Sequence, residues 1–231
     1  MRDISAPEPV QRYLLRALGA TTAAVTRAQL RQQGELRTDP RSRRWYAFTA
    51  NEVVDPVDVS FSWTARVRIA PWIHLRVDDG YARGRGTGRV KLQSAITIMS
   101  DAGTAELHAA ALLRFLAESP WYPSALLPST HLRWCAVDHT RATACLTDHG
   151  VTVEVEFRFD DAGDIVGMYA PARPRKTSTG YTLDAWEGHF IDYADRAGLR
   201  VPLHGEVGWY VDGAWACVWR GRIVEAHYQF D

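Results

Sequence analysis

An arginine and a glutamate one helical turn apart are the residues of this sequence best placed to do chemistry. Arg114 and Glu118 lie four positions apart, and a proline-bracketed aromatic pair, Trp121 and Tyr122, follows them. Side chains at this spacing share one face of a helix, so opposite charges would meet large aromatic surfaces at the helix end. A carboxyl group in such apolar surroundings has a raised pKa and can serve as an acid or a base. The alternative is a capped helix end with a packed aromatic plug.

A second carboxyl group follows the next apolar run. Trp134 lies within that run and Asp138 at its far end. If a strand over 131–138 lies beneath the helix, Glu118, Trp134 and Asp138 share one cavity. We therefore take Glu118 and Asp138 as candidate catalytic groups, although an ion pair would explain each equally well.

The remaining candidate residues would bind the substrate. Arginines would orient an enolate or a carboxylate, and aromatic side chains would line the pocket. The candidate substrate-binding residues are Arg114, Trp121, Tyr122, Trp134, Arg173 and Trp186. Core packing or an ion pair is the alternative for every one of them.

No motif indicates a cofactor or a metal. The glycines of 84–88 lack the third glycine and the following helix of a dinucleotide fingerprint, and they favour a bend or bulge in a curved sheet. The residues Cys135, His139, Cys145 and His149 lack the paired spacing of zinc ligands. We expect neither cofactor nor metal.

Composition excludes several classes of protein. The 231 residues carry 27 basic and 27 acidic side chains, so no overall field attracts nucleic acid. No run of apolar residues approaches the roughly 18 to 20 that a membrane span needs. Charges interrupt the first thirty residues, and the three cysteines lie in apolar runs typical of buried free thiols. These features predict a cytoplasmic protein.

Alternation of apolar and polar residues predicts a sheet that dominates the fold. In 151–159 the odd positions are Val or Phe and the even positions are polar or charged. Strands are predicted at 24–37, 43–53, 59–69, 73–77, 81–98, 131–147, 151–159, 164–173, 186–194 and 204–212, with a closing hairpin over 215–230 that turns at 220–222. Helices are predicted at 6–18 and 104–118.

These elements predict one domain over 1–231 of the α+β class, mostly β. About ten antiparallel strands would curl into a half-barrel or open barrel, with one main helix near 104–118 and a short N-terminal helix. One helix cannot cover the concave face of such a sheet. Aromatic side chains fill the remainder, or a cavity accepts an apolar ligand.

Most of the sequence resembles an uncharacterised bacterial family. The residues that carry the resemblance are the run 114–118 with Trp121, Pro123 and 125–127, then Trp134, Asp138, Arg173, Trp186, Tyr193, Pro202 and Trp209. The resemblance implies a curled antiparallel sheet similar to the half-barrel of lipoprotein carriers. It implies no settled activity.

Two functional hypotheses use the expected cavity. The first is a cofactor-independent cyclase or isomerase that acts on an apolar or polycyclic small molecule. The second is a non-catalytic carrier or sensor of lipid-like ligands. A carrier should tolerate Glu118→Gln and Asp138→Asn, whereas an enzyme should not. A structural or scaffold role is the third alternative, and a homodimer formed through exposed strand edges stays open.

Overall fold

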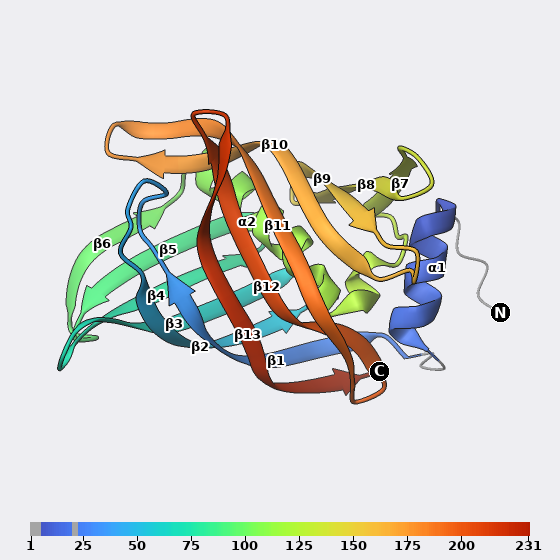
Figure 1. Cartoon of the computed structure of the whole chain (residues 1–231), viewed down its shortest axis with the longest axis horizontal. Helices are drawn as coiled ribbons and strands as arrows, with labels where there is room; N and C mark the ends of the chain where they lie inside the picture. The colour runs from blue at the N-terminus through green and yellow to red at the C-terminus, as the bar shows by residue number, and fades with distance from the viewer. Residues whose placement is uncertain (1–5, 20–22) are drawn as a thin grey trace.

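The computed structural model describes residues 6–19 and 23–231, and within them the chain forms one antiparallel sheet of thirteen strands with two α-helices (Figure 1). The strands are β1 (Val25–Leu36), β2 (Tyr46–Asp55), β3 (Ser60–Ala70), β4 (Ile73–Ala82), β5 (Arg85–Leu92), β6 (Ile96–Ala102), β7 (Leu132–Ala136), β8 (Arg141–Asp148), β9 (Val151–Phe159), β10 (Ile165–Thr177), β11 (Gly180–Arg196), β12 (Leu199–Val211) and β13 (Ala214–Phe230). The expected fold class, a large curled antiparallel sheet with one main helix and a short N-terminal one, is confirmed.

The order of the strands shows how the sheet is built. From one edge to the other it is β6-β5-β4-β3-β2-β1-β13-β12-β11-β10-β9-β8-β7. The chain therefore adds strands outward from β1 to one edge, crosses the sheet, and returns from the opposite edge to β13. Its first and last strands pair in the middle, where residues 25–36 lie against 219–230. Two halves joined by this central pair form one continuous sheet.

The connection between the halves is the main helix, α2 (Ala105–Glu118). The hydroxyl oxygen of Thr104 accepts a hydrogen bond from the backbone N–H of Leu107 and caps its first turn. Pro120 and Pro123 follow the helix, and the chain continues as two short 3-10 turns, 119–121 and 123–126. The helix contacts β4 and β5 on one side and β9 and β10 on the other, so both halves enclose it (Figure 1).

A glycine permits the close approach of this helix to the sheet. A Cβ atom on Gly86 of β5 would lie 2.5 Å from the carbonyl oxygen of Leu107 and 2.9 Å from the Cβ of Ala111. Both distances are too short for any other residue without movement of α2. Gly86, which lies within β5, therefore brings helix and sheet together, whereas Gly84 has a left-handed φ in the turn before β5.

The two faces of the sheet differ in burial. We call the face that carries α2 the inner face and the opposite one the outer face. In β2, Phe48 and Ala50 are buried on the inner face, while Thr49 and Asn51 between and beside them are exposed on the outer face. The neighbouring strand β3 keeps this alternation, with Phe61, Trp63 and Ala65 buried and Arg66 and Arg68 exposed.

The N-terminal helix, α1 (Glu8–Leu18), lies near β8 and β12 (Figure 1). Its buried residues include Val10, Tyr13 and Leu14, and the Arg16 guanidinium donates to Asp164 at 3.0 Å. Neither helix of the described residues is long and apolar enough to cross a membrane.

Two local predictions were wrong. The expected hairpin over 215–230 is one continuous strand, because Gly221 is not a turn residue. Gly221 instead leaves room for two aromatic rings. A Cβ atom at this position would lie 2.8 Å from the ring of Trp219 and 3.2 Å from the ring of Phe48. Of the cysteines, Cys135 is exposed rather than buried, and the other two are half-buried.

The number of strands exceeds the expected ten because predicted segments contain more than one strand. Residues 81–98 include the end of β4, all of β5 and the start of β6, and 131–147 contain β7 and most of β8. The turn between β5 and β6 has two left-handed residues, Gln93 and Ser94, and no glycine or proline marks it in the sequence.

Candidate functional site

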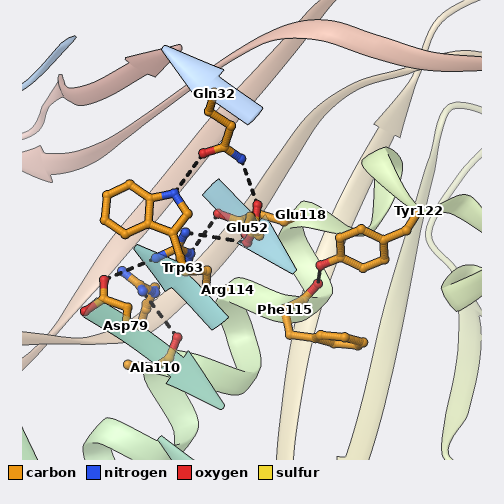
Figure 2. A network of polar contacts seen from close by, with 10 residues as sticks. Gln32, Glu52, Trp63, Asp79, Ala110, Arg114, Phe115, Glu118 and Tyr122 are labelled. Atoms are coloured by element: carbon orange, nitrogen blue, oxygen red, sulfur yellow. Dashed lines mark hydrogen bonds and ion pairs between the residues drawn. The ribbon is translucent and has the colours of Figure 1, made fainter. Parts of the chain in front are cut away.

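The Arg114 side chain is the centre of a buried charge cluster on the inner face (Figure 2). Its Nε lies 2.8 Å from Oε1 of Glu118, one nitrogen lies 3.2 Å from Asp79 of β4, and another lies 3.7 Å from Glu52 of β2. The guanidinium also stacks 4.8 Å from the ring centroid of Trp63. Arg114 and Glu118 therefore form the ion pair that their spacing predicts, and they share it with carboxyl groups of the sheet.

Glu52 is the most deeply buried member of this cluster. Its Oε2 accepts a hydrogen bond of 2.7 Å from Gln32, and the amide oxygen of Gln32 accepts one of 2.8 Å from the Trp63 indole (Figure 2). Burial raises the pKa of Glu52 well above 4.5, and the negative charge of Glu118 raises it further. Glu52 therefore keeps its proton to a higher pH than an exposed glutamate does.

The other charged members respond to the same surroundings. Burial raises the pKa of Asp79, while Arg114 beside it acts in the opposite direction. Burial alone would lower the pKa of Arg114, but Glu118, Glu52 and Asp79 raise it overall. Arg114 thus keeps its charge in the interior.

A second arginine holds α2 from the other half of the sheet. Arg173 of β10 lies between two indoles, 4.3 Å from the ring centroid of Trp186 and 5.1 Å from that of Trp209. Its Nη2 donates to the carbonyl oxygen of Ala110 in α2 at 3.2 Å. Burial, and then the positive charge of Arg114, lower the pKa of Arg173 to about 10. Two arginines therefore connect α2 to both halves.

The predicted aromatic residues fill the inner face. Trp121 packs edge-on against Phe190 at 6.1 Å between ring centroids, and the fully buried Tyr122 donates its hydroxyl to the carbonyl oxygen of Phe115 at 2.6 Å. The Trp134 indole donates to the carbonyl oxygen of Leu126 at 3.0 Å. Together with Trp186, these rings occupy the concave face that the sequence left to either aromatics or a cavity.

Asp138 lies away from this cluster, in the turn between β7 and β8. Its carboxylate accepts hydrogen bonds of 2.8 Å from the backbone of Thr140 and from Nε of Arg141. These bonds lower the pKa of Asp138 to about 2. The expectation of a carboxyl with a raised pKa in a cavity shared with Glu118 was wrong for Asp138, because the turn satisfies its oxygens locally.

A large groove lies on the outer face of the sheet. It is an open groove of about 1120 Å³ that runs across β3, β2, β1, β13, β12 and β11. Its lining residues are Gln33, Gly34, Glu35, Ala47, Phe48, Thr49, Arg66, Arg68, Ala70, Pro71, Trp72, Ile73, His74, His189, Ile191, His204, Gly205, Glu206, Arg220, Gly221 and Arg222. None of the eight residues predicted from the sequence lines it.

The twist of the sheet explains a hollow on the face that carries no helix. Adjacent strands rotate by some 20–25°, so a wide sheet becomes saddle-shaped, concave along one diagonal on each face. α2 occupies the hollow of the inner face. The outer hollow lies across the central β1–β13 pair, where the two halves meet.

The groove carries an excess of positive charge. Of its arginines, Arg220 pairs with Glu35 at 2.7 Å, whereas Arg66, Arg68 and Arg222 have no ion-pair partner among the residues that the structure describes. Apolar residues such as Ala70, Trp72 and Ile191 also line the groove, and the methylene groups of arginine side chains are apolar as well. An amphipathic ligand with an acidic group fits such a lining.

A histidine in the groove is fully engaged by carboxylates. His189 contacts Glu206 through Nδ1 at 3.1 Å and Glu187 through Nε2 at 3.0 Å. Glu187 also accepts a hydrogen bond of 2.7 Å from Tyr210. Carboxylates therefore occupy both ring nitrogens of His189, and neither nitrogen is left without a partner.

Sequence reasoning missed these residues although their pattern was visible. Arg66 and Arg68 flank Val67 on the polar side of an alternating run, and Arg220 and Arg222 flank Gly221. Alternation over 59–69 predicts only that the first pair lies on the polar side of a strand, and the second pair falls in the turn predicted at 220–222. Four arginines at alternating positions of two strands are the signal, but the pairing that places those strands in one groove is not local.

Comparison with known proteins gives a family and a distant likeness of fold. Residues 5–228 match the "Family of unknown function (DUF6920)", and no functionally curated protein matches the sequence. Among solved structures, a putative outer membrane lipoprotein-sorting protein domain from Vibrio parahaemolyticus is similar at 7% identity and a TM-score of 0.46, with 88% of this chain and 85% of that chain covered. A LolA superfamily protein from Nitrosomonas europaea is similar at 9% identity and a TM-score of 0.46, with 96% and 92% covered. The resemblance to an uncharacterised family is confirmed, and the chain belongs to the DUF6920 family.

Proposed function

We propose that this protein is a non-catalytic carrier of amphipathic, lipid-like molecules, which bind in the outer groove. The single observation that carries the proposal is the open groove of about 1120 Å³, lined by arginine stems and apolar side chains. Ligand pockets for drug-sized molecules measure roughly 300–1,000 Å³, so this groove has room for a long-chain or polycyclic molecule.

The positive charge of the lining indicates which polar group the ligand carries. Arg66, Arg68 and Arg222 present guanidinium groups that no carboxylate neutralises within the described part of the chain. Guanidinium groups bind carboxylates and phosphates through paired hydrogen bonds. The proposed ligand therefore has an apolar body and one anionic group.

The inner face has fewer groups available for a ligand than the outer face has. Its carboxyl groups bond to Arg114, and its aromatic rings pack against one another. The cyclase or isomerase activity remains a prediction, to be tested by offering a candidate substrate to wild-type and Glu118→Gln protein. A cytoplasmic location likewise remains a prediction.

Titration with a fluorescent fatty-acid analogue tests the carrier function. Thr49 lines the groove, so the indole of Thr49→Trp would take the place of part of the bound probe. The probe would then lose apolar contacts, and burial of one large side chain is worth on the order of 1.5–3 kcal/mol. We therefore expect its affinity to fall at least about tenfold. Asn51→Trp is the matched control, since Asn51 is exposed on the same face of the same strand but outside this groove. Equal affinity for wild type and Thr49→Trp would contradict the proposal.

A further inference from the structure

The turns at one end of the sheet expose an apolar surface next to the groove. Trp72, in the turn between β3 and β4, is 93% exposed, and Ile96 at the start of β6 is 64% exposed. Gln93 joins the two turns, because its side-chain amide donates to the carbonyl oxygen of Trp72 at 2.8 Å and its backbone N–H to that of His74 at 3.0 Å. We call residues 70–74 and 93–98 the Trp72 tip.

Basic side chains surround this tip. Arg66 and Arg68 are exposed on the outer face of β3, directly before the turn, and Arg44 donates to the carbonyl oxygen of Ile69 at 2.8 Å. None of the three arginines has an ion-pair partner among residues 6–19 and 23–231. The tip therefore combines an exposed indole, exposed aliphatic side chains and uncompensated cations.

We propose that the Trp72 tip docks on the surface of an anionic lipid bilayer. Tryptophan is enriched at the interface between lipid and water, where its ring lies at the level of the headgroups. Arginines close to a surface of acidic lipids gain attraction from its negative potential. An exposed indole and aliphatic side chains beside three unpaired arginines match both the apolar and the charged part of such a surface.

The Trp72 tip lies at one end of the groove, so docking through it would bring the groove to the bilayer. Pro71, Trp72, Ile73 and His74 belong to the tip and also line one end of the groove. A protein docked through this end would open its groove towards the bilayer, and a lipid-like molecule could enter without crossing water. This entry route rests on the proposed carrier function, whereas docking itself does not.

A second copy of the chain is the alternative occupant. β6 is an edge strand, and edge strands can pair between molecules. In a symmetric dimer the same surface meets itself, so each tip would bring its arginines towards those of its partner. Charge complementarity therefore favours the bilayer.

Flotation with lipid vesicles tests the proposal on the intact chain. Wild type should float with vesicles of equal parts phosphatidylglycerol and phosphatidylcholine, and should not float with phosphatidylcholine alone. Arg66→Gln with Arg68→Gln should weaken partition into the mixed vesicles roughly thirtyfold, since each surface cation contributes about 1 kcal/mol. Trp72→Ala should weaken it at least about tenfold.

Two further variants make the result specific. Val57→Ala, a control in the turn at the opposite end of β3 where Val57 is 62% exposed, should float as wild type does. Ile96 belongs to the tip but not to the groove, so Ile96→Ser should weaken vesicle binding and keep its affinity for the fatty-acid probe in solution. Docking is overturned if wild type ignores the mixed vesicles, if Trp72→Ala floats unchanged, or if sedimentation shows a dimer that Trp72→Ala dissociates. Wild type that binds the probe but not the vesicles refutes docking alone, and the reverse result refutes the carrier function alone.

Discussion

The two faces of one sheet have opposite contents. The inner face is filled by α2, by aromatic rings and by a cluster in which Arg114 joins three carboxyl groups. The outer face keeps an open groove with three arginines that lack carboxylate partners in the described part of the chain. Removing one partner of a charge cluster inside a packed core is strongly destabilising, whereas uncompensated charge beside open apolar surface is free to bind. The comparison assigns stability to one face and ligand binding to the other.

The largest effect is expected from removing the central arginine of the inner face. Arg114→Met leaves Glu118 and Asp79 without their counter-charge, and breaking such a buried pair costs about 3–5 kcal/mol. Urea denaturation measures the loss. Arg141→Met is the control, because the ion pairs of Arg141 are exposed and screened by water, so its loss should change stability far less. Equal stability of the two variants would mean that the cluster is not what holds α2.

The next effect concerns the distance between α2 and β5. Gly86→Ala places a Cβ atom against the carbonyl oxygen of Leu107, and overpacking of this kind costs typically 1–3 kcal/mol. The matched control is Gly88→Ala in the same strand, where the nearest atom, in Asp79, would be 3.5 Å away. Thermal unfolding should separate the two variants. A stable Gly86→Ala protein would show that the helix lies farther from the sheet than described.

A smaller effect should appear on the outer face, in ligand selectivity rather than stability. Arg222→Gln removes a cation from the groove wall and should lower affinity for a fatty acid by about 1.5–3 kcal/mol, the worth of a hydrogen bond to a charged group. Affinity for the corresponding fatty alcohol should stay unchanged. Competition against the fluorescent probe measures both ligands. Parallel losses for acid and alcohol would remove the anionic group from the proposed ligand.

The smallest effect is a pH dependence of stability. The folded protein holds the pKa of Glu52 above 4.5, so folding takes up a proton where the unfolded carboxyl is already ionised. Stability from this group is therefore complete below 4.5 and falls as the pH rises towards the folded pKa. Glu52→Gln removes the proton uptake, so its stability relative to wild type should increase over that range, and the variant should lie within about 1 kcal/mol of wild type in acid.

Denaturation at a series of pH values measures this difference. Glu225→Gln serves as the control, because Glu225 is an exposed carboxylate paired with Arg31. A constant difference between Glu52→Gln and wild type across the series would contradict a raised pKa for the buried Glu52.

The sequence predicted the architecture better than the site. Period-two alternation determines strands and their two faces locally, and residues such as Val153 and Phe157 point inward as their positions predict. The ion pair of Arg114 with Glu118 likewise follows from spacing along one helix. Alternation cannot tell which face a helix fills, and the groove depends on the twist of a sheet whose central strands are almost two hundred residues apart.

One measurement tests the assignment of binding to the outer face most directly. Protein is loaded with a photoreactive fatty acid and irradiated, and the labelled residues are identified by mass spectrometry. The account predicts labels on the groove lining, at Thr49, Arg66 and Ile191. Labels concentrated instead on Leu112, Trp121 and Trp134 of the inner face would contradict it.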